Sequence, residues 1–380
     1  MKKGIFVILA GCCLVFVSRC KQEVKPFYYA SEEEFLQNNI GLSDSAKIGK
    51  QIFFDKNLSE PAGISCATCH SPMSGFSDPR HTPFSEGVLG KSGTRNANAI
   101  GYMGFAPNRG AEIIRGVWEE AGGFFWDGKA EFLNQQALFP LTSPHEMNNY
   151  SFSVVSSKLK HAPYYKDLEN LFGKEVLRDS QTIVFYAITC LQAFQQSSQV
   201  SPFTSKFDFY LQGKATLSEQ EKRGMQLFND TTKSKCSLCH LSKPTSYAST
   251  DKILFTDYSY DNLGLPKSPF LQNTPIDSGL AKFEMGKAQE VGRFKTPTLR
   301  NIEKTAPYIH SGIFKDLEEV MEFYNERDIN QKFAHPEVAS TINKDDLGDL
   351  KLTKQEINDI IAFLKTLTDG YRLPSTEKNN

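Results

Sequence analysis

Two short stretches of the chain share one pattern, CATCH at residues 66–70 and CSLCH at residues 236–240. Two thiols at this spacing can form thioether bonds to the vinyl groups of a haem, and the following His can ligate its iron. The sequence therefore predicts two covalently bound c-type haems, whose protein ligands would be Cys66, Cys69, His70, Cys236, Cys239 and His240.

Zinc is the alternative metal for such a set of thiols. A structural zinc site would need the four thiolates close together, whereas the two Cys pairs are 170 residues apart in the sequence. The only cysteine left over in the body of the chain is Cys190, which lies in an apolar stretch and is expected to be an inert buried thiol.

The surroundings of the two motifs also repeat. GKQIF at 49–53 precedes the first motif and GMQLF at 224–228 precedes the second, while an Arg-Asn pair follows each of them, at 95–96 and 300–301. Matched landmarks in one order indicate a duplicated module. We expect a mainly α fold of two cytochrome-c-like helical domains, residues 46–205 and 206–380, each with one haem and packed around a shared interface.

Helical periodicity supports this fold class. Apolar residues recur at helical spacing in six segments, which are 46–54, 129–139, 180–197, 218–228, 316–325 and 353–367. No run alternates apolar and polar residues for long enough to require a sheet. The stretch 241–295 has little periodicity, and we expect it to be loop with short strands at most.

The N-terminus resembles an export signal. A basic start is followed by an apolar run from Ile5 to Val17, which is too short to span a bilayer. We interpret residues 1–20 as a lipoprotein-type signal with Cys20 as the lipidated residue, Cys12 being the alternative, and residues 21–45 as a tether. This predicts a periplasmic protein anchored to a membrane. The net charge of −1 provides no field that would favour nucleic acid.

Further motifs make the chain resemble a known family. They are FWDGKA at 125–130, QA at 136–137, EM at 146–147, TPTLRN at 296–301 and TAPYIH at 305–310. From about residue 48 to 367 the sequence is similar to the bacterial di-haem cytochrome c peroxidases, a family that includes the methylamine-utilisation di-haem enzymes. The resemblance implies that the N-terminal haem meets hydrogen peroxide and that the C-terminal haem takes electrons from a small donor protein.

Cleavage of peroxide needs an open iron position and a group that moves a proton between the two oxygens. By the resemblance, Glu146 is the candidate acid–base residue and Gln136 would hold the bound peroxide or water. Without the resemblance, Glu146 would be interpreted as an ordinary surface acid. His145 beside it is expected to be incidental.

Members of the family that need reductive activation carry a capping His seven residues before the Arg-Asn pair. Here that place is taken by Val88, which cannot bind iron. His81 is the nearest substitute, and otherwise it is a surface histidine. We therefore expect the N-terminal haem to be five-coordinate in the oxidised state.

The sixth ligand of the second haem is left between two residues. Tyr324 falls where the methylamine-utilisation enzymes have Tyr and the peroxidases have Met, and Met321 lies one helical turn earlier on the same face. Met would raise the reduction potential and favour electron transfer, whereas a phenolate would stabilise ferric iron. Both residues could instead be core residues of a helix packed on the haem.

The resemblance also implies a bridging Trp126 between the haems and a calcium ion, with Asn96, Thr305 and Pro307 as its ligands. The function predicted is reduction of hydrogen peroxide with electrons from a cytochrome c or a cupredoxin. One alternative is oxidation of a protein or small molecule through high-valent iron, and another is a non-enzymatic electron carrier. A homodimer is compatible with the sequence, which does not fix the oligomeric state.

Overall fold

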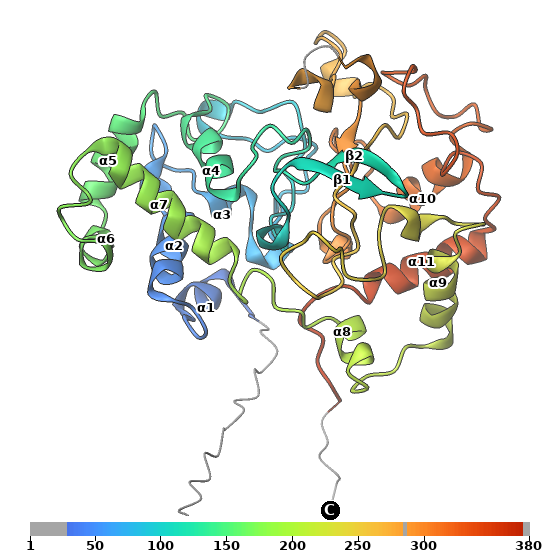
Figure 1. Ribbon diagram of the computed structural model, residues 1–380, viewed down its shortest axis with the longest axis horizontal. Helices are drawn as coiled ribbons and strands as arrows, with labels where there is room; N and C mark the ends of the chain where they lie inside the picture. The colour runs from blue at the N-terminus through green and yellow to red at the C-terminus, as the bar shows by residue number, and fades with distance from the viewer. Residues whose placement is uncertain (1–28, 284–286, 375–380) are drawn as a thin grey trace, which may run out of the picture.

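The computed structural model describes residues 29–283 and 287–374 (Figure 1). The predicted signal, with Cys12 and Cys20, lies outside these residues. In Figure 1 the chain up to about residue 200 forms one helical body, and the rest forms a second body beside it. Within the described ranges, no helix is long and apolar enough to cross a membrane.

The N-terminal body is built on two crossing helices, α2 (Asp44–Phe54) and α7 (Ser180–Gln195). Ser43 caps α2 and Asp179 begins α7 with a capping box, so that both helices have defined starts. Gly49 lies at the crossing, where a Cβ would come 1.9 Å from the carbonyl oxygen of Cys190. The smaller helices around this pair are α1 (Glu32–Gln37), α3 (Cys66–Cys69), α4 (Leu133–Thr142), α5 (Phe152–His161) and α6 (Tyr165–Phe172).

The C-terminal body repeats this arrangement. Helix α9 (Glu219–Asn229) packs on α11 (Lys354–Lys365), and a Cβ at Gly224 would lie 1.8 Å from the carbonyl oxygen of Asp359. A capping box at Thr353 starts α11, as its sequence indicates. Helices α8 (Lys206–Leu211) and α10 (Leu317–Glu326) complete the body. The equivalent glycine crossings indicate that the two halves are copies of one helical module.

Strand structure is confined to short pairs among the described residues. β1 (Gly110–Ile114) and β2 (Val117–Ala121) form an antiparallel hairpin, and β3 (Tyr260–Asp261) pairs with β4 (Phe294–Lys295). The second pair lies in the stretch predicted to be loop with short strands. The hairpin was not predicted, because its turn is Arg115-Gly116 with φ of 51° and 86°, and Arg is not a usual residue at such a position.

Each half sends one segment to the other half. The hairpin, which precedes the midpoint of the chain, lies on the C-terminal body in Figure 1, and Glu119 of β2 forms an ion pair with Arg293 at 3.2 Å. In return, residues 267–282 of the C-terminal half line the large cavity of the N-terminal half. The two bodies are therefore joined by these exchanged segments as well as by the surfaces at which they meet.

Five of the six predicted helices are present within two residues of their predicted bounds as α2, α7, α9, α10 and α11. The sixth, α4, starts at Leu133 instead of residue 129. The described part of the predicted tether is not a free linker, since α1 lies in it and Phe35 is 1% exposed in the N-terminal core. Lys50 donates to the carbonyl oxygens of Phe35 and Asn38, which ties this segment to α2.

Candidate active site

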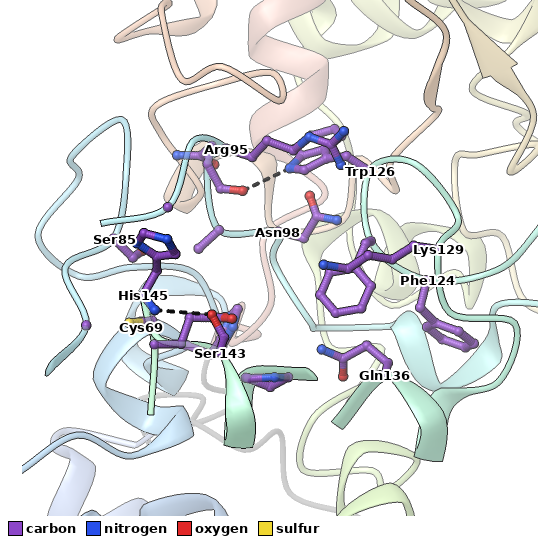
Figure 2. Close-up of a pocket in the computed structure, with 18 of the residues that line it drawn as sticks. Cys69, Ser85, Arg95, Asn98, Phe124, Trp126, Lys129, Gln136, Ser143 and His145 are labelled. Carbon is purple, nitrogen blue, oxygen red and sulfur yellow. Dashed lines mark hydrogen bonds between the residues drawn. The ribbon is translucent and has the colours of Figure 1, made fainter. Parts of the chain in front are cut away.

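A cavity of about 700 Å³ opens in the N-terminal body. Helices α2, α4 and α7 supply apolar walls, and the loop after the first Cys-x-x-Cys-His motif supplies polar ones. In the view of Figure 2, Cys69 and His145 lie on one side, Gln136 and Lys129 on the other, and Arg95 and Trp126 at one end. The cavity thus gathers residues from distant parts of the chain around the first motif.

The first motif is held by its own short helix. Ser65 and Thr68 form a capping box at the start of α3, and His70 follows the helix. The His70 Nδ1 lies 3.2 Å from the carbonyl oxygen of Phe76, so that this nitrogen carries the proton and Nε2 is left as the free ligand atom. Burial lowers the pKa of His70, which favours the neutral imidazole that binds metals.

Gln136 and Glu146 line the same cavity as His70. Gln136 lies on α4, and Glu146 lies in the turn after it. The exposed surface of the Glu146 side chain faces the cavity and not the outside of the protein. Partial removal from bulk water therefore raises the pKa of Glu146. A hydrogen bond from Ser143 and the charges of Lys129 and His145 act in the opposite direction. A carboxyl whose pKa is raised holds a proton more readily and can release it again, as a general acid–base must.

A second cavity, of about 170 Å³, surrounds the second motif. The His240 Nδ1 lies 3.0 Å from the carbonyl oxygen of Phe255, repeating the arrangement at His70, and burial lowers the pKa of His240 to about 4. Tyr324 and Met321 of α10 both line this cavity. Burial, followed by the Cys239 and Cys236 thiols, raises the pKa of Tyr324, so that a phenolate there would need a bound cation.

The two thiol pairs line different cavities, and the described residues hold no cluster of three or more His, Cys, Asp or Glu that could bind a metal. This excludes a zinc site made of all four cysteines. An Arg lies beside the second thiol of each motif, with Arg80 Nη2 3.4 Å from the Cys69 Sγ and Arg115 Nη1 3.5 Å from the Cys239 Sγ.

Trp126 lines both cavities. Its Nε1 donates to the carbonyl oxygen of Asn96 at 2.9 Å, and its ring meets that of His310 edge-on at 6.4 Å. His310 in turn stacks on Phe294 at 3.5 Å, and burial lowers the pKa of His310 to about 3. Sequence reasoning assigned no role to His310 or Phe294, although His310 lies in one of the quoted motifs.

An ion-pair network fixes the segment that carries Trp126. Arg95 donates to both carboxylate oxygens of Asp277 at 2.7 Å and pairs with Asp127 at 2.5 Å. Asp127 is 1% exposed and directly follows Trp126. Because Asp277 belongs to the C-terminal half, this network also joins the two halves beside the cavity.

The loop that would carry a capping ligand is fastened beside Glu146. Val88 is buried, and its N–H donates to the carbonyl oxygen of Glu146 at 3.0 Å. Gly87 passes so close that a Cβ there would lie 2.2 Å from the carbonyl oxygen of His145. His81 is exposed, lines neither cavity, and has its Nδ1 2.9 Å from the carbonyl oxygen of Ala306.

The residues expected to bind calcium meet around the loop at 81–83. The Asn96 amide donates to the carbonyl oxygen of Pro83 at 3.2 Å, and its N–H donates to that of His310 at 2.7 Å. His81 of the same loop contacts the carbonyl between Thr305 and Pro307. These contacts leave the calcium assignment a prediction.

The family model for the di-haem cytochrome c peroxidases matches residues 43–216. The methylamine utilization protein MauG of Paracoccus denitrificans is 35% identical over 361 residues, which cover 88% of this chain and 91% of that protein. The chain belongs to the di-haem cytochrome c peroxidase family.

Other members show the breadth of this oxidoreductase family. The cytochrome c551 peroxidase of Nitrosomonas europaea is 30% identical over 89% of this chain and 85% of its own length. Among solved structures, the di-haem peroxidase BthA of Burkholderia thailandensis superposes with a TM-score of 0.77 at 31% identity, covering 86% of each chain. A MauG-like protein associated with microbial copper homeostasis gives a TM-score of 0.68 at 29% identity, and the match covers 86% of this chain and 90% of that protein.

Membership in the di-haem family implies two c-type haems, and the residues fit them. Each cavity is lined by two thiols and by a His whose Nδ1 is already engaged, which leaves Nε2 to meet an iron. In the first cavity, Asn98 Oδ1 and Ser311 Oγ are buried and have no hydrogen-bond partner among the described residues. A polar group bound in the cavity would satisfy such atoms.

Proposed function

We propose that this protein is a peroxidase that reduces hydrogen peroxide to water at the N-terminal haem. The observation that carries the proposal is the single cavity that holds the first haem motif together with Gln136 and Glu146. When bound, the haem supplies the iron at which the O–O bond is cleaved. The chain itself supplies the residues that position peroxide and move its protons.

Glu146 acts as the general acid–base in this proposal. Its raised pKa allows the carboxylate to accept a proton from the arriving peroxide and to return it to the departing oxygen. The Gln136 amide holds the peroxide or the product water from the α4 side of the cavity. A side-chain amide donates and accepts hydrogen bonds but does not titrate, so the proton-transfer role falls to Glu146.

The resting state follows from the loop beside Glu146. Val88 occupies the place of a capping His, and His81 is engaged with Ala306 away from both cavities. The oxidised protein should therefore have one high-spin ferric haem and react with peroxide without prior reduction. A fully oxidised protein that is entirely low-spin, and that becomes active only after one-electron reduction, would contradict this.

Electrons would enter at the His240 haem and pass Trp126 to the His70 haem. The position of Trp126 in both cavity walls, with His310 and Phe294 beside it, supports this route. The donor would be a small cytochrome c or cupredoxin of the periplasm. A calcium ion at Asn96, Thr305 and Pro307, a lipid anchor at Cys20 and a homodimer belong to the same proposal.

A second function is favoured by Tyr324. Because a Tyr rather than a Met lies at the predicted ligand position, and because relatives named MauG are 31–35% identical, the protein could oxidise a protein or small-molecule substrate instead of drawing electrons from a donor. Both functions start with peroxide at the first haem. They differ in where the two oxidising equivalents go.

The deciding experiment mixes the ferric protein with peroxide and offers two sources of electrons. A reduced cytochrome c or cupredoxin that is oxidised catalytically, at two equivalents per peroxide, supports the peroxidase. No donor oxidation, together with slow decay of the reacted protein, favours the second function. No reaction with peroxide of either the ferric protein or the protein reduced by one electron would leave only an electron carrier.

A further inference from the structure

Lys129 lies in the wall of the first cavity and forms no ion pair with any of the described residues. Its side chain is half-buried and lines the cavity, and Figure 2 shows it extending inward between Trp126 and Gln136. Its Nζ lies 4.0 Å from the centre of the Phe125 ring and 4.9 Å from that of Phe139. Two aromatic faces thus hold the ammonium group in place.

Three other cations in and near this cavity are committed to partners, whereas Lys282, which also lines it, is exposed to solvent. Arg95 is bound by Asp277 and Asp127, and Lys267 pairs with Glu337 at 3.8 Å. Lys295, which is buried behind the Trp126 segment, donates to the carbonyl oxygen of Gly123. By contrast, the Lys129 ammonium forms no ion pair and donates no hydrogen bond to any residue in the part of the chain that the structure describes.

An ammonium group removed from bulk water needs partners for its N–H groups, and it has three of them. The aromatic faces satisfy its charge in part but accept no conventional hydrogen bond. The open side of Lys129 is the cavity, which also contains Glu146 and Gln136. The missing partner is therefore a species that enters the cavity, and a small anion suits it best.

We propose that Lys129 makes the first cavity an anion site and that its ligand during turnover is the hydroperoxide anion. The reaction step rests on the proposed peroxidase function, whereas the anion site does not. Glu146 takes one proton from neutral hydrogen peroxide, and the ammonium group stabilises the hydroperoxide charge that results. When the O–O bond breaks, Glu146 returns that proton and the departing hydroxide leaves as water. The remaining oxygen takes two electrons from the donor protein and two protons from solvent to form the second water.

The charges around both groups are consistent with this division of roles. Burial lowers the pKa of Lys129, while Asp127 and Glu146 raise it and Arg95 and Lys282 lower it further. Asp127 is already paired with Arg95, so that Glu146 is the acid available to Lys129 inside the cavity. His145 is the other residue that lowers the pKa of Glu146 through charge.

The test measures binding of azide, an anion, and of imidazole, a neutral ligand, to the oxidised holoprotein by absorption spectroscopy. Lys129→Met should weaken azide binding about tenfold, which corresponds to about 1.4 kcal/mol, and leave imidazole binding unchanged. Lys129→Arg should restore azide binding. Lys332→Met is the matched control, since Lys332 also lies over a ring, that of Phe333 at 5.0 Å, but on the surface and paired with Glu322.

A second measurement follows the carboxyl band of Glu146 by infrared difference spectroscopy, identified by its loss in Glu146→Gln. Lys129→Met should shift the titration of this band to higher pH, because the carboxylate loses a neighbouring cation. Equal losses of azide and imidazole affinity, no loss of either, or a wild-type protein that binds imidazole but no azide would each overturn the proposal. If azide affinity depends on Lys129 but peroxide is not turned over, the anion site stands and the peroxidase function fails.

Discussion

The glycine crossing in each half gives a stringent test of the duplicated architecture. In Gly49→Ala, the new Cβ would lie 1.9 Å from the carbonyl oxygen of Cys190, and ordinary contact begins at 3.4 Å. Since the obstructing atom belongs to the backbone of α7, it cannot rotate away. Helices α2 and α7 would have to separate locally by the difference, about 1.5 Å.

This separation should cost more than the alanine gains. Alanine is favoured over glycine inside a helix by about 1 kcal/mol. Overfilling a packed core typically costs about 1–3 kcal/mol, and a backbone obstruction places this site at the upper end. A gap of 0.5–1 Å already forfeits about a quarter to a half of the dispersion attraction across it. We expect a net loss of about 2 kcal/mol in the free energy of unfolding.

The effect should also be local to one haem site. Residues Ile52 and Phe53 of α2 and Ile188 of α7 line the first cavity, so that Gly49→Ala should alter the spectrum of the N-terminal haem. Gly224→Ala, with its Cβ 1.8 Å from the Asp359 oxygen, should instead alter the C-terminal haem.

Denaturant unfolding and ferric absorption spectra measure both effects. Gly110→Ala is the control, because a Cβ at Gly110 would meet nothing within 4 Å. If Gly49→Ala were as stable as Gly110→Ala and left both haem spectra unchanged, then the close crossing of α2 and α7 would not exist as described.

Three further predictions address the chemistry. Glu146→Gln should slow the reaction with peroxide about 10²–10⁴-fold, as measured by stopped flow. In the wild type this rate should fall as the pH drops through a Glu146 pKa that lies above the ordinary value of about 4.3, because the carboxylate is the form that accepts the proton, and the variant should lack this fall. Tyr324→Met should raise the reduction potential of the second haem by clearly more than ~60 mV, which is a tenfold change in a one-electron equilibrium. Met321→Leu should leave this potential unchanged. The reverse result in a redox titration would make Met321 the ligand. Trp126→Phe keeps a ring but loses the hydrogen bond to the Asn96 carbonyl, and it should slow electron transfer between the haems in rapid-mixing experiments; an unchanged rate would remove Trp126 from the route.

The sequence predicted the elements that have their own local signals. Helix α11 begins at a Thr353 capping box and carries a regular apolar stripe, and its bounds were predicted within two residues. Helix α1 was missed because it has only six residues, three of them acidic, and a single buried side chain, Phe35. Tertiary contact with α2, rather than periodicity, holds it in place.

The sequence indicated candidate residues for the site but not the shape of the cavity or all of the segments that line it. The motifs singled out Glu146, Gln136 and Trp126, and all three line the first cavity. Nothing local to residues 267–282 indicates that they would line a cavity of the other half, because that contact depends on how the halves meet. Lys129 was visible in the FWDGKA motif, yet that it has no ion partner among the described residues appears only when the surrounding charges are placed in space.

The exchange of segments means that neither haem site is built by one half alone. The hairpin brings Arg115 from the N-terminal half to the second thiol of the C-terminal motif and to Asp346, at 3.5 and 3.3 Å. Asp277 brings a carboxylate from the C-terminal half to Arg95, beside Trp126. Removing either half would therefore open the other half's cavity and strip partners from buried charges, which costs several kcal/mol for each uncompensated ion. The two modules thus depend on each other. This dependence holds Trp126 in place between the two cavities, both of which it lines.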